Sequence, residues 1–217
     1  MIATVWIAIL IVVTTAATVV LLAQVLLPRI AARRIERRLT GSGGVAEVAV
    51  EAVPALRLLG DRGDRLVARG SGLTIGLGED GEERAAGLRA LDGFAEVDVE
   101  LTDLRAGPFA IAAFVLVRHA SGPYAMAAEG VVTGTELARF GAAWLPTSIP
   151  GGTLIGAAAR RAPLGGRSVP VAIEVELHSE AEGLRVGSGG GTIAGYPAGP
   201  IATTIAAAVA RRLEIAP

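Results

Sequence analysis

The chain opens with a run of apolar residues, Met1 to Leu27, that carries no charge. As a helix this run would be about 40 Å long, which exceeds the roughly 30 Å hydrocarbon core of a bilayer. Its few polar side chains are threonines and Gln24, and a helical threonine returns its hydroxyl hydrogen bond to the preceding turn. We therefore predict a transmembrane anchor over residues 1–28 and one tethered domain over residues 29–217.

A cleaved signal peptide is the alternative interpretation of this segment. Signal peptides place basic residues before a short apolar core and small residues at the cleavage site. Here no basic residue precedes the core, the core is long, and Ala23-Gln24-Val25-Leu26-Leu27 makes a poor cleavage site. The sequence favours an anchor that is not cleaved.

An arginine-rich stretch follows the anchor directly. The helical pattern continues through it, with Ala31, Ile35 and Leu39 on one face, until residues 40–44 end it. On the other face we expect contacts to lipid headgroups from Arg33, Arg34, Arg37 and Arg38. Each contact would be worth about 1 kcal/mol near an anionic surface, and a merely solvated face is the alternative. The positive-inside rule places the arginine-rich side, and the domain with it, in the cytoplasm.

Composition removes several functional classes. The net charge is −1 and aromatic residues make up 4% of the chain, so neither a basic surface nor a stacking platform for nucleic acid is expected. All basic residues are arginine, and the absence of cysteine removes disulfides, thiol catalysis and thiolate metal sites.

The rest of the sequence alternates between apolar and polar residues with a period of two. This pattern predicts strands near residues 48–52, 65–77, 96–102, 109–117, 124–132, 171–178 and 184–193. Helices are predicted at 133–145, where Thr133 and Glu136 form a capping box, and at 200–213. Because strands and helices do not alternate regularly, we expect an α+β fold with a curved, mostly antiparallel sheet.

Two glycine-rich motifs are candidate phosphate sites. Residues 76–81 fit the dinucleotide pattern at Gly76, Gly78 and Gly81, but four carboxylates between residues 79 and 83 would crowd a pyrophosphate. An acidic surface turn is favoured there, and a dinucleotide enzyme remains the lesser hypothesis. Residues 187–191 lack a following Gly-Lys-Ser/Thr, so a flexible turn is favoured.

The sequence offers little for catalysis or metal binding. The two histidines, His119 and His178, have no metal-ligand spacing, and His178 with Glu174 and Glu176 makes an ordinary solvated strand face. We predict no enzyme activity, no cofactor and no metal.

Apolar strand residues are numerous although aromatic ones are few. We predict that the inward residues of these strands line a groove that an acyl chain completes; a dry core of small residues is the alternative. By periodicity the lining residues are Val97, Val99, Leu101, Phe109, Ile111, Phe114, Val171, Ile173 and Val175.

Two stretches, residues 88–109 (LRALDGFAEVDVELTDLRAGPF) and 129–137 (EGVVTGTEL), resemble the actinobacterial LmeA-like phospholipid-binding family. The similarity extends over residues 33–213. It implies a tubular lipid-binding fold, in which a curved antiparallel sheet wraps a long helix, and no catalytic residues. It also implies a role in the cell envelope, in support of envelope lipid or lipoglycan maintenance. That location is outside the cytoplasmic membrane, whereas the positive-inside rule predicts the cytoplasm.

Together these observations predict a single-pass protein of the cytoplasmic membrane that binds phospholipid through an extracytoplasmic domain, with membrane and phospholipid as partners and no nucleic acid. The alternative is a non-catalytic envelope scaffold with a dry core.

Overall fold

The computed structural model describes residues 2–75, 91–120, 122–137, 139, 166–180, 183–199 and 202–203. The Gly76–Gly81 motif and most of the helices predicted at 133–145 and 200–213 lie outside these residues. The described part contains one long helix, a short 3-10 helix and a nine-stranded sheet.

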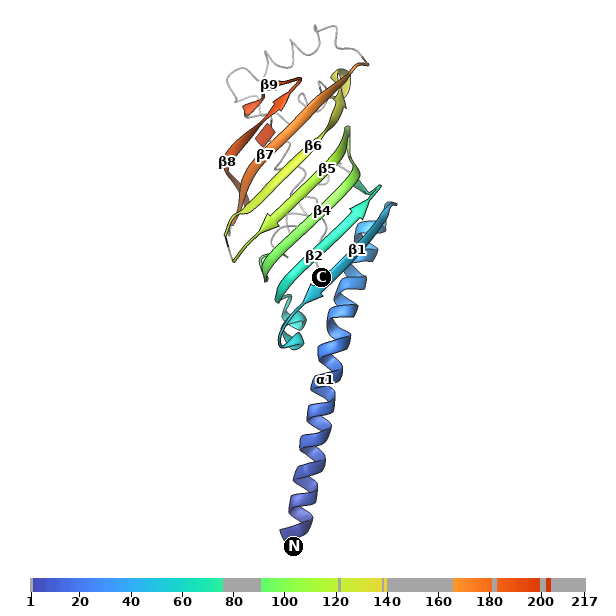
Figure 1. The fold of residues 1–217 in the computed structure, drawn as a ribbon, viewed down its shortest axis with the longest axis vertical. Coiled ribbons are helices and arrows are strands. Elements are labelled where there is room, and N and C mark those ends of the chain that lie inside the picture. The colour runs from blue at the N-terminus through green and yellow to red at the C-terminus, as the bar shows by residue number, and fades with distance from the viewer. Residues whose placement is uncertain are drawn as a thin grey trace.

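The long helix, α1 (Ile2–Thr40), is a single element of 39 residues that continues through Pro28. The hydroxyls of Thr15 and Thr18 donate to the carbonyls of Ile11 and Thr14, each at 2.8 Å, as expected for threonines in an apolar helix. Figure 1 shows α1 extending away from the sheet toward the N-terminus. By length and composition α1 is able to cross a membrane.

The strands form one sheet in the order β1-β2-β4-β5-β6-β7-β8-β9, with β3 paired to β4 (Figure 1). A short 3-10 helix, η1 (Ala55–Gly60), joins β1 to β2. The strand bounds are β1 Val45–Glu51, β2 Gly63–Ser71, β3 Thr74–Ile75, β4 Phe94–Ala106, β5 Phe109–Arg118, β6 Tyr124–Thr133, β7 Ser168–Glu180, β8 Gly183–Ile193 and β9 Tyr196–Pro197.

The α+β class is therefore confirmed, and the sheet is mixed. Among the described strands β4 pairs in parallel with β2 and β3, and the other neighbours are antiparallel. The parallel pairs were not predicted, because the connection that produces them contains the acidic stretch that sequence alone read as a simple turn between strands. The sheet is open and uncurled over these strands, and α1 packs against β1 and η1.

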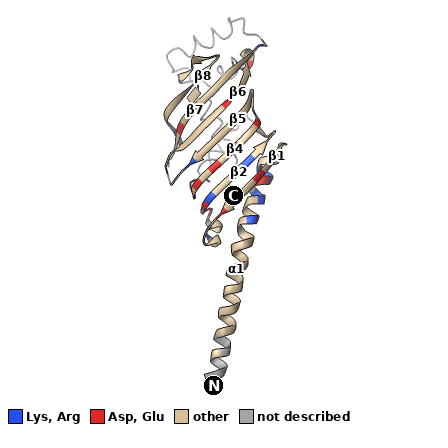
Figure 2. Ribbon diagram, viewed as in Figure 1, with Lys and Arg blue, Asp and Glu red and all other residues tan. Residues whose placement is uncertain are grey.

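The two faces of the sheet differ in character. One face is apolar and buried, and the C-terminal half of α1 joins it through Ile35 and Leu39. The opposite face carries charge, including ion pairs between β2 and β4 at Arg65–Glu96 (3.7 Å) and Arg69–Glu100 (3.2 Å). Figure 2 shows these charges on the ribbon, together with the arginines near the end of α1. Period-two alternation thus gives an amphipathic sheet, as predicted.

The strand predicted at 184–193 is found as β8, and the flexible turn predicted within it at residues 187–191 is wrong. Gly189, Gly190 and Gly191 pair with β7, and the ladder shifts register next to them. The glycines are needed for close approach of the two strands. A Cβ at Gly191 would lie 2.4 Å from the Ala172 carbonyl oxygen, and one at Gly189 would lie 2.3 Å from that of Glu174. Gly189 also has a φ of +124°, which side-chain-bearing residues rarely adopt.

Candidate functional site

The predicted lining residues all lie on the buried face of the sheet. None is more than 6% exposed. They come from three strands: Val97, Val99 and Leu101 from β4, Phe109, Ile111 and Phe114 from β5, and Val171, Ile173 and Val175 from β7. The structure therefore brings together residues that are up to 78 positions apart in the sequence.

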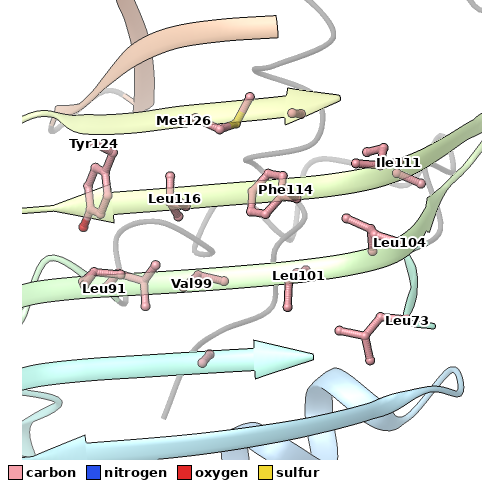
Figure 3. Packing of buried hydrophobic residues seen from close by; sticks show 14 of the residues in the cluster. Leu73, Leu91, Val99, Leu101, Leu104, Ile111, Phe114, Leu116, Tyr124 and Met126 are labelled. Atoms are coloured by element: carbon pink, nitrogen blue, oxygen red, sulfur yellow. The ribbon is translucent and has the colours of Figure 1, made fainter. Parts of the chain in front are cut away.

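Strand register aligns these residues in rows across the sheet. One row runs Leu101–Phe114–Ala128–Ile173 from β4 to β7. Neighbouring rows run Val99–Leu116–Met126–Val175 and Leu104–Ile111–Gly130–Val171. Figure 3 shows the β4 and β5 members of these rows side by side, with Met126 of β6 next to them. In two of the three rows the β6 position is small, Ala128 or Gly130, whereas its neighbours on β5 and β7 are large.

The β6 contribution to this face was not predicted from the sequence. Met126 and Ala128 of β6, together with Leu104 of β4 and Leu116 of β5, complete the rows and are each at most 8% exposed. The β6 sequence YAMAAEGVVT has small residues on both faces, which conceals the alternation. Tyr124 and Met126, two residues apart and both buried, were the available signal.

The helix α1 meets the apolar face through one stripe of side chains. Leu27 and Ala31 pack against the core cluster, and Ile35 and Leu39 are buried within it. The spacing of four residues places all of them on one helix face. The apolar helix and the apolar sheet face are thus continuous.

Arg33, Arg34, Arg37 and Arg38 are exposed on the other side of this stripe. At about 1.5 Å per residue they lie roughly 13 to 21 Å along the helix axis from Gln24. The structure places them beside the domain, and headgroup contact remains a prediction.

A polar cluster closes one end of the buried face. The Tyr124 hydroxyl donates to Asp92 Oδ1 at 2.9 Å and accepts from Arg118 Nη1 at 2.9 Å, and the same Arg118 nitrogen lies 3.3 Å from Asp92 Oδ1. Arg118 Nε donates to the Gly122 carbonyl at 3.2 Å, and the guanidinium lies 4.9 Å from the Tyr124 ring centre. Burial, with a smaller contribution from Asp92, raises the pKa of Tyr124. The cluster ties the β5–β6 turn to the start of β4.

The charged face of the sheet carries an open groove of about 660 Å³, whose lining includes Ile173 and Val175, two of the predicted lipid-lining residues. Small residues of β6, β7 and β8, including Ala125, Ala172 and Gly190, form part of its lining, together with the carboxylates Glu129, Glu174 and Glu176. Ser188 donates to Glu176 at 2.5 Å. Within the described residues there is no group of three or more His, Asp or Glu side chains that could hold a metal ion.

Comparison with known proteins adds no family to this description. No protein-family model, curated protein or solved structure matches the chain. The resemblance to the LmeA-like family therefore stays a prediction from the sequence.

Proposed function

We propose that this chain is a membrane-anchored, non-catalytic phospholipid-binding protein. In this proposal α1 spans the membrane and the domain holds lipid acyl chains against the apolar face of its sheet. The arginines on α1 meet the headgroups of lipids that the domain holds. The domain lies on the envelope side of the cytoplasmic membrane, where the family resemblance places it.

The observation that carries the proposal is the continuity of the apolar helix with the apolar sheet face. The stripe Leu27, Ala31, Ile35 and Leu39 packs at the β1 edge of the sheet, and it belongs to the same apolar cluster as the buried rows of β4, β5 and β7. An acyl chain that left a bilayer along this stripe would stay in contact with apolar side chains. We place such a chain against the small β6 residue Ala128, between Phe114 and Ile173 in its row.

The resemblance also implies a sheet wrapped around a long helix, and we include this geometry in the proposal. This geometry is supported by Ile35 and Leu39 of α1, which belong to the core of the sheet next to β1. Curling of the described open sheet toward the helix would enclose a bound acyl chain.

Photocrosslinking of the full chain tests the proposal. The protein would be placed in nanodiscs that contain a phospholipid with a photoreactive acyl chain, and the adducts would be located by peptide mass spectrometry. We expect adducts on peptides from β4, β5 and β7 as well as on α1. Ala128→Phe should lower the sheet adducts several-fold and leave the α1 adducts unchanged, because the ring would occupy the acyl position.

Ala127→Phe is the matched control, because Ala127 is the exposed neighbour of Ala128 on the other face. It should leave both sets of adducts unchanged. Adducts confined to α1 in the unsubstituted protein would overturn the proposal. In that case Ala128→Phe should instead destabilise a dry core by about 1 to 3 kcal/mol through overpacking.

A non-catalytic interaction domain is the second candidate function. The groove on the charged face favours it, since exposed Val115 and Val131 lie on that face among alanines and glutamates. This candidate predicts a dry core and a protein partner that covers the outer face.

A further inference from the structure

The junction between α1 and the domain is fixed by one side chain. Gln24 Nε2 donates to the Ala52 carbonyl at 2.9 Å, and the Ala55 amide donates to Gln24 Oε1 at 2.7 Å. Both partners belong to the segment that carries the chain from β1 into η1. Gln24, the polar residue predicted to be tolerated inside the anchor, therefore holds this corner of the domain against the helix.

The lengths of the two elements agree with this attachment. From Gln24 to Thr40 the helix rises about 24 Å, and from Val45 to Ala52 the extended chain returns about 23 Å. The domain thus runs back along α1 and reaches it again at Gln24. In Figure 1, η1 is the short coil at the lower end of β2, on the side of the sheet that faces the N-terminal part of α1.

The corner exposes large apolar side chains at this point. Val53, Leu56 and Leu59 are 72%, 49% and 73% exposed, whereas Ala55 and Leu58 of the same segment are buried. Residues three apart in a 3-10 helix lie on the same side, so Leu56 and Leu59 project together. The adjacent helix surface is apolar as well, with Val25, Leu26 and Ile30 about half exposed.

This apolar corner lies at the depth where a bilayer would end. Ile2 to Ala23 would span about 33 Å, close to the roughly 30 Å of a hydrocarbon core. The next residue is Gln24, and charges begin nearby at Arg29 on the helix and at the Arg57–Asp64 ion pair (2.5 Å) beside η1. An apolar tip bordered by arginine is the surface that an interfacial membrane contact requires.

We propose that Val53, Leu56 and Leu59 insert into the acyl boundary of the bilayer beside α1 and hold the domain against the membrane surface. This inference rests on the membrane-spanning part of the proposed function and does not depend on lipid binding in the sheet. The protein then has a second membrane contact besides α1. The corner of the sheet where η1 joins β1 to β2 is the part of the domain nearest the lipid.

Single-cysteine labelling tests the inference on the full chain, which has no native cysteine. Leu59→Cys and Val53→Cys would each be labelled with an environment-sensitive fluorophore in vesicles of phosphatidylcholine and phosphatidylglycerol that contain a lipid-attached quencher. We expect a blue-shifted emission and several-fold stronger quenching than at Val45→Cys. Val45 is the matched control, because it is 69% exposed at the opposite end of β1.

Val13→Cys, within the predicted span, separates the two proposals. If Val13 is quenched while Leu59 behaves like Val45, the helix enters the bilayer but the inferred corner contact is absent, and the inference is overturned. If neither position is quenched, the membrane anchor itself fails and the inference fails with it. Quenching at Val13 and Leu59, without quenching at Val45, supports the inference.

Discussion

Tyr124 is the residue on which the buried polar cluster depends. Its hydroxyl is shared between Asp92 and Arg118, each at 2.9 Å. Replacement by phenylalanine leaves both partners without this hydrogen bond in a partly buried site. We expect Tyr124→Phe to lower the free energy of unfolding by about 1 to 3 kcal/mol at neutral pH, measured by denaturant unfolding.

The same residue predicts how stability changes at alkaline pH. Burial and the Asp92 hydrogen bond raise the pKa of Tyr124 in the folded protein, whereas a tyrosine in the unfolded chain ionises at about pH 10. Above that pH the unfolded chain releases a proton that the folded chain keeps, so stability falls as pH rises.

The sequence isolates this alkaline effect unusually well, because the chain has no lysine or cysteine and only two tyrosines. We therefore expect the alkaline loss of stability to disappear in Tyr124→Phe, with unfolding followed at a series of pH values. Tyr196→Phe is the control, since Tyr196 is 76% exposed, and it should keep the loss. An unchanged alkaline slope in Tyr124→Phe would contradict the assignment.

The pairing of β7 with β8 rests on glycines whose roles differ. A Cβ at Gly191 would lie 2.4 Å from the Ala172 carbonyl oxygen and 2.8 Å from the Ala202 Cβ, whereas one at Gly190 would meet nothing within 4 Å. We expect Gly191→Ala to cost about 1 to 3 kcal/mol of unfolding free energy. Gly190→Ala should stay within roughly 0.5 kcal/mol of the parent protein. Equal effects of the two substitutions in denaturant unfolding would show that close strand approach does not explain the glycines.

Elements with a strong local signal could be predicted from the sequence. The β4–β5 hairpin has clear alternation around a Gly-Pro turn, and the Thr133–Glu136 capping box forms as predicted, with the Glu136 amide donating to Thr133 Oγ1 at 3.2 Å. The face of the candidate site followed from the same alternation. The strand at 184–193 was predicted as well, but its residues 187–191 carry no bulky side chains and no apolar periodicity, so a flexible turn was expected there. The strand geometry of these residues depends on close contact with the backbone of β7, which the pattern of side chains does not reveal.

Pairing between strands could not be predicted in the same way. The parallel contact of β2 with β4 joins strands separated by residues 72–93, and period-two patterns do not encode the partner of a strand. The link from Gln24 to Ala52 and Ala55 is similarly non-local. A glutamine in an apolar helix indicates a partner, but only the fold identifies it.

The arginine-bearing part of α1 belongs to the folded domain, and this bears on the orientation of the whole molecule. Leu27, Ala31, Ile35 and Leu39 attach the segment to the sheet core, so its arginines lie on a structural helix. The positive-inside rule describes charged loops next to a membrane span. A helix that folds with its domain is a weaker topology signal, which is the physical ground for our proposal that the domain lies on the envelope side.

Cysteine accessibility in intact cells tests this orientation. A Val45→Cys variant of the full chain offers one exposed thiol on the domain, because the parent chain has none. We expect a membrane-impermeant maleimide to label it without permeabilisation, since the domain would face outward. Val13→Cys, within the predicted span, should resist the same aqueous reagent before and after permeabilisation. Labelling of Val45→Cys only after permeabilisation would place the domain in the cytoplasm, and the arginines of α1 would then have acted as the topology signal despite their packing against the domain.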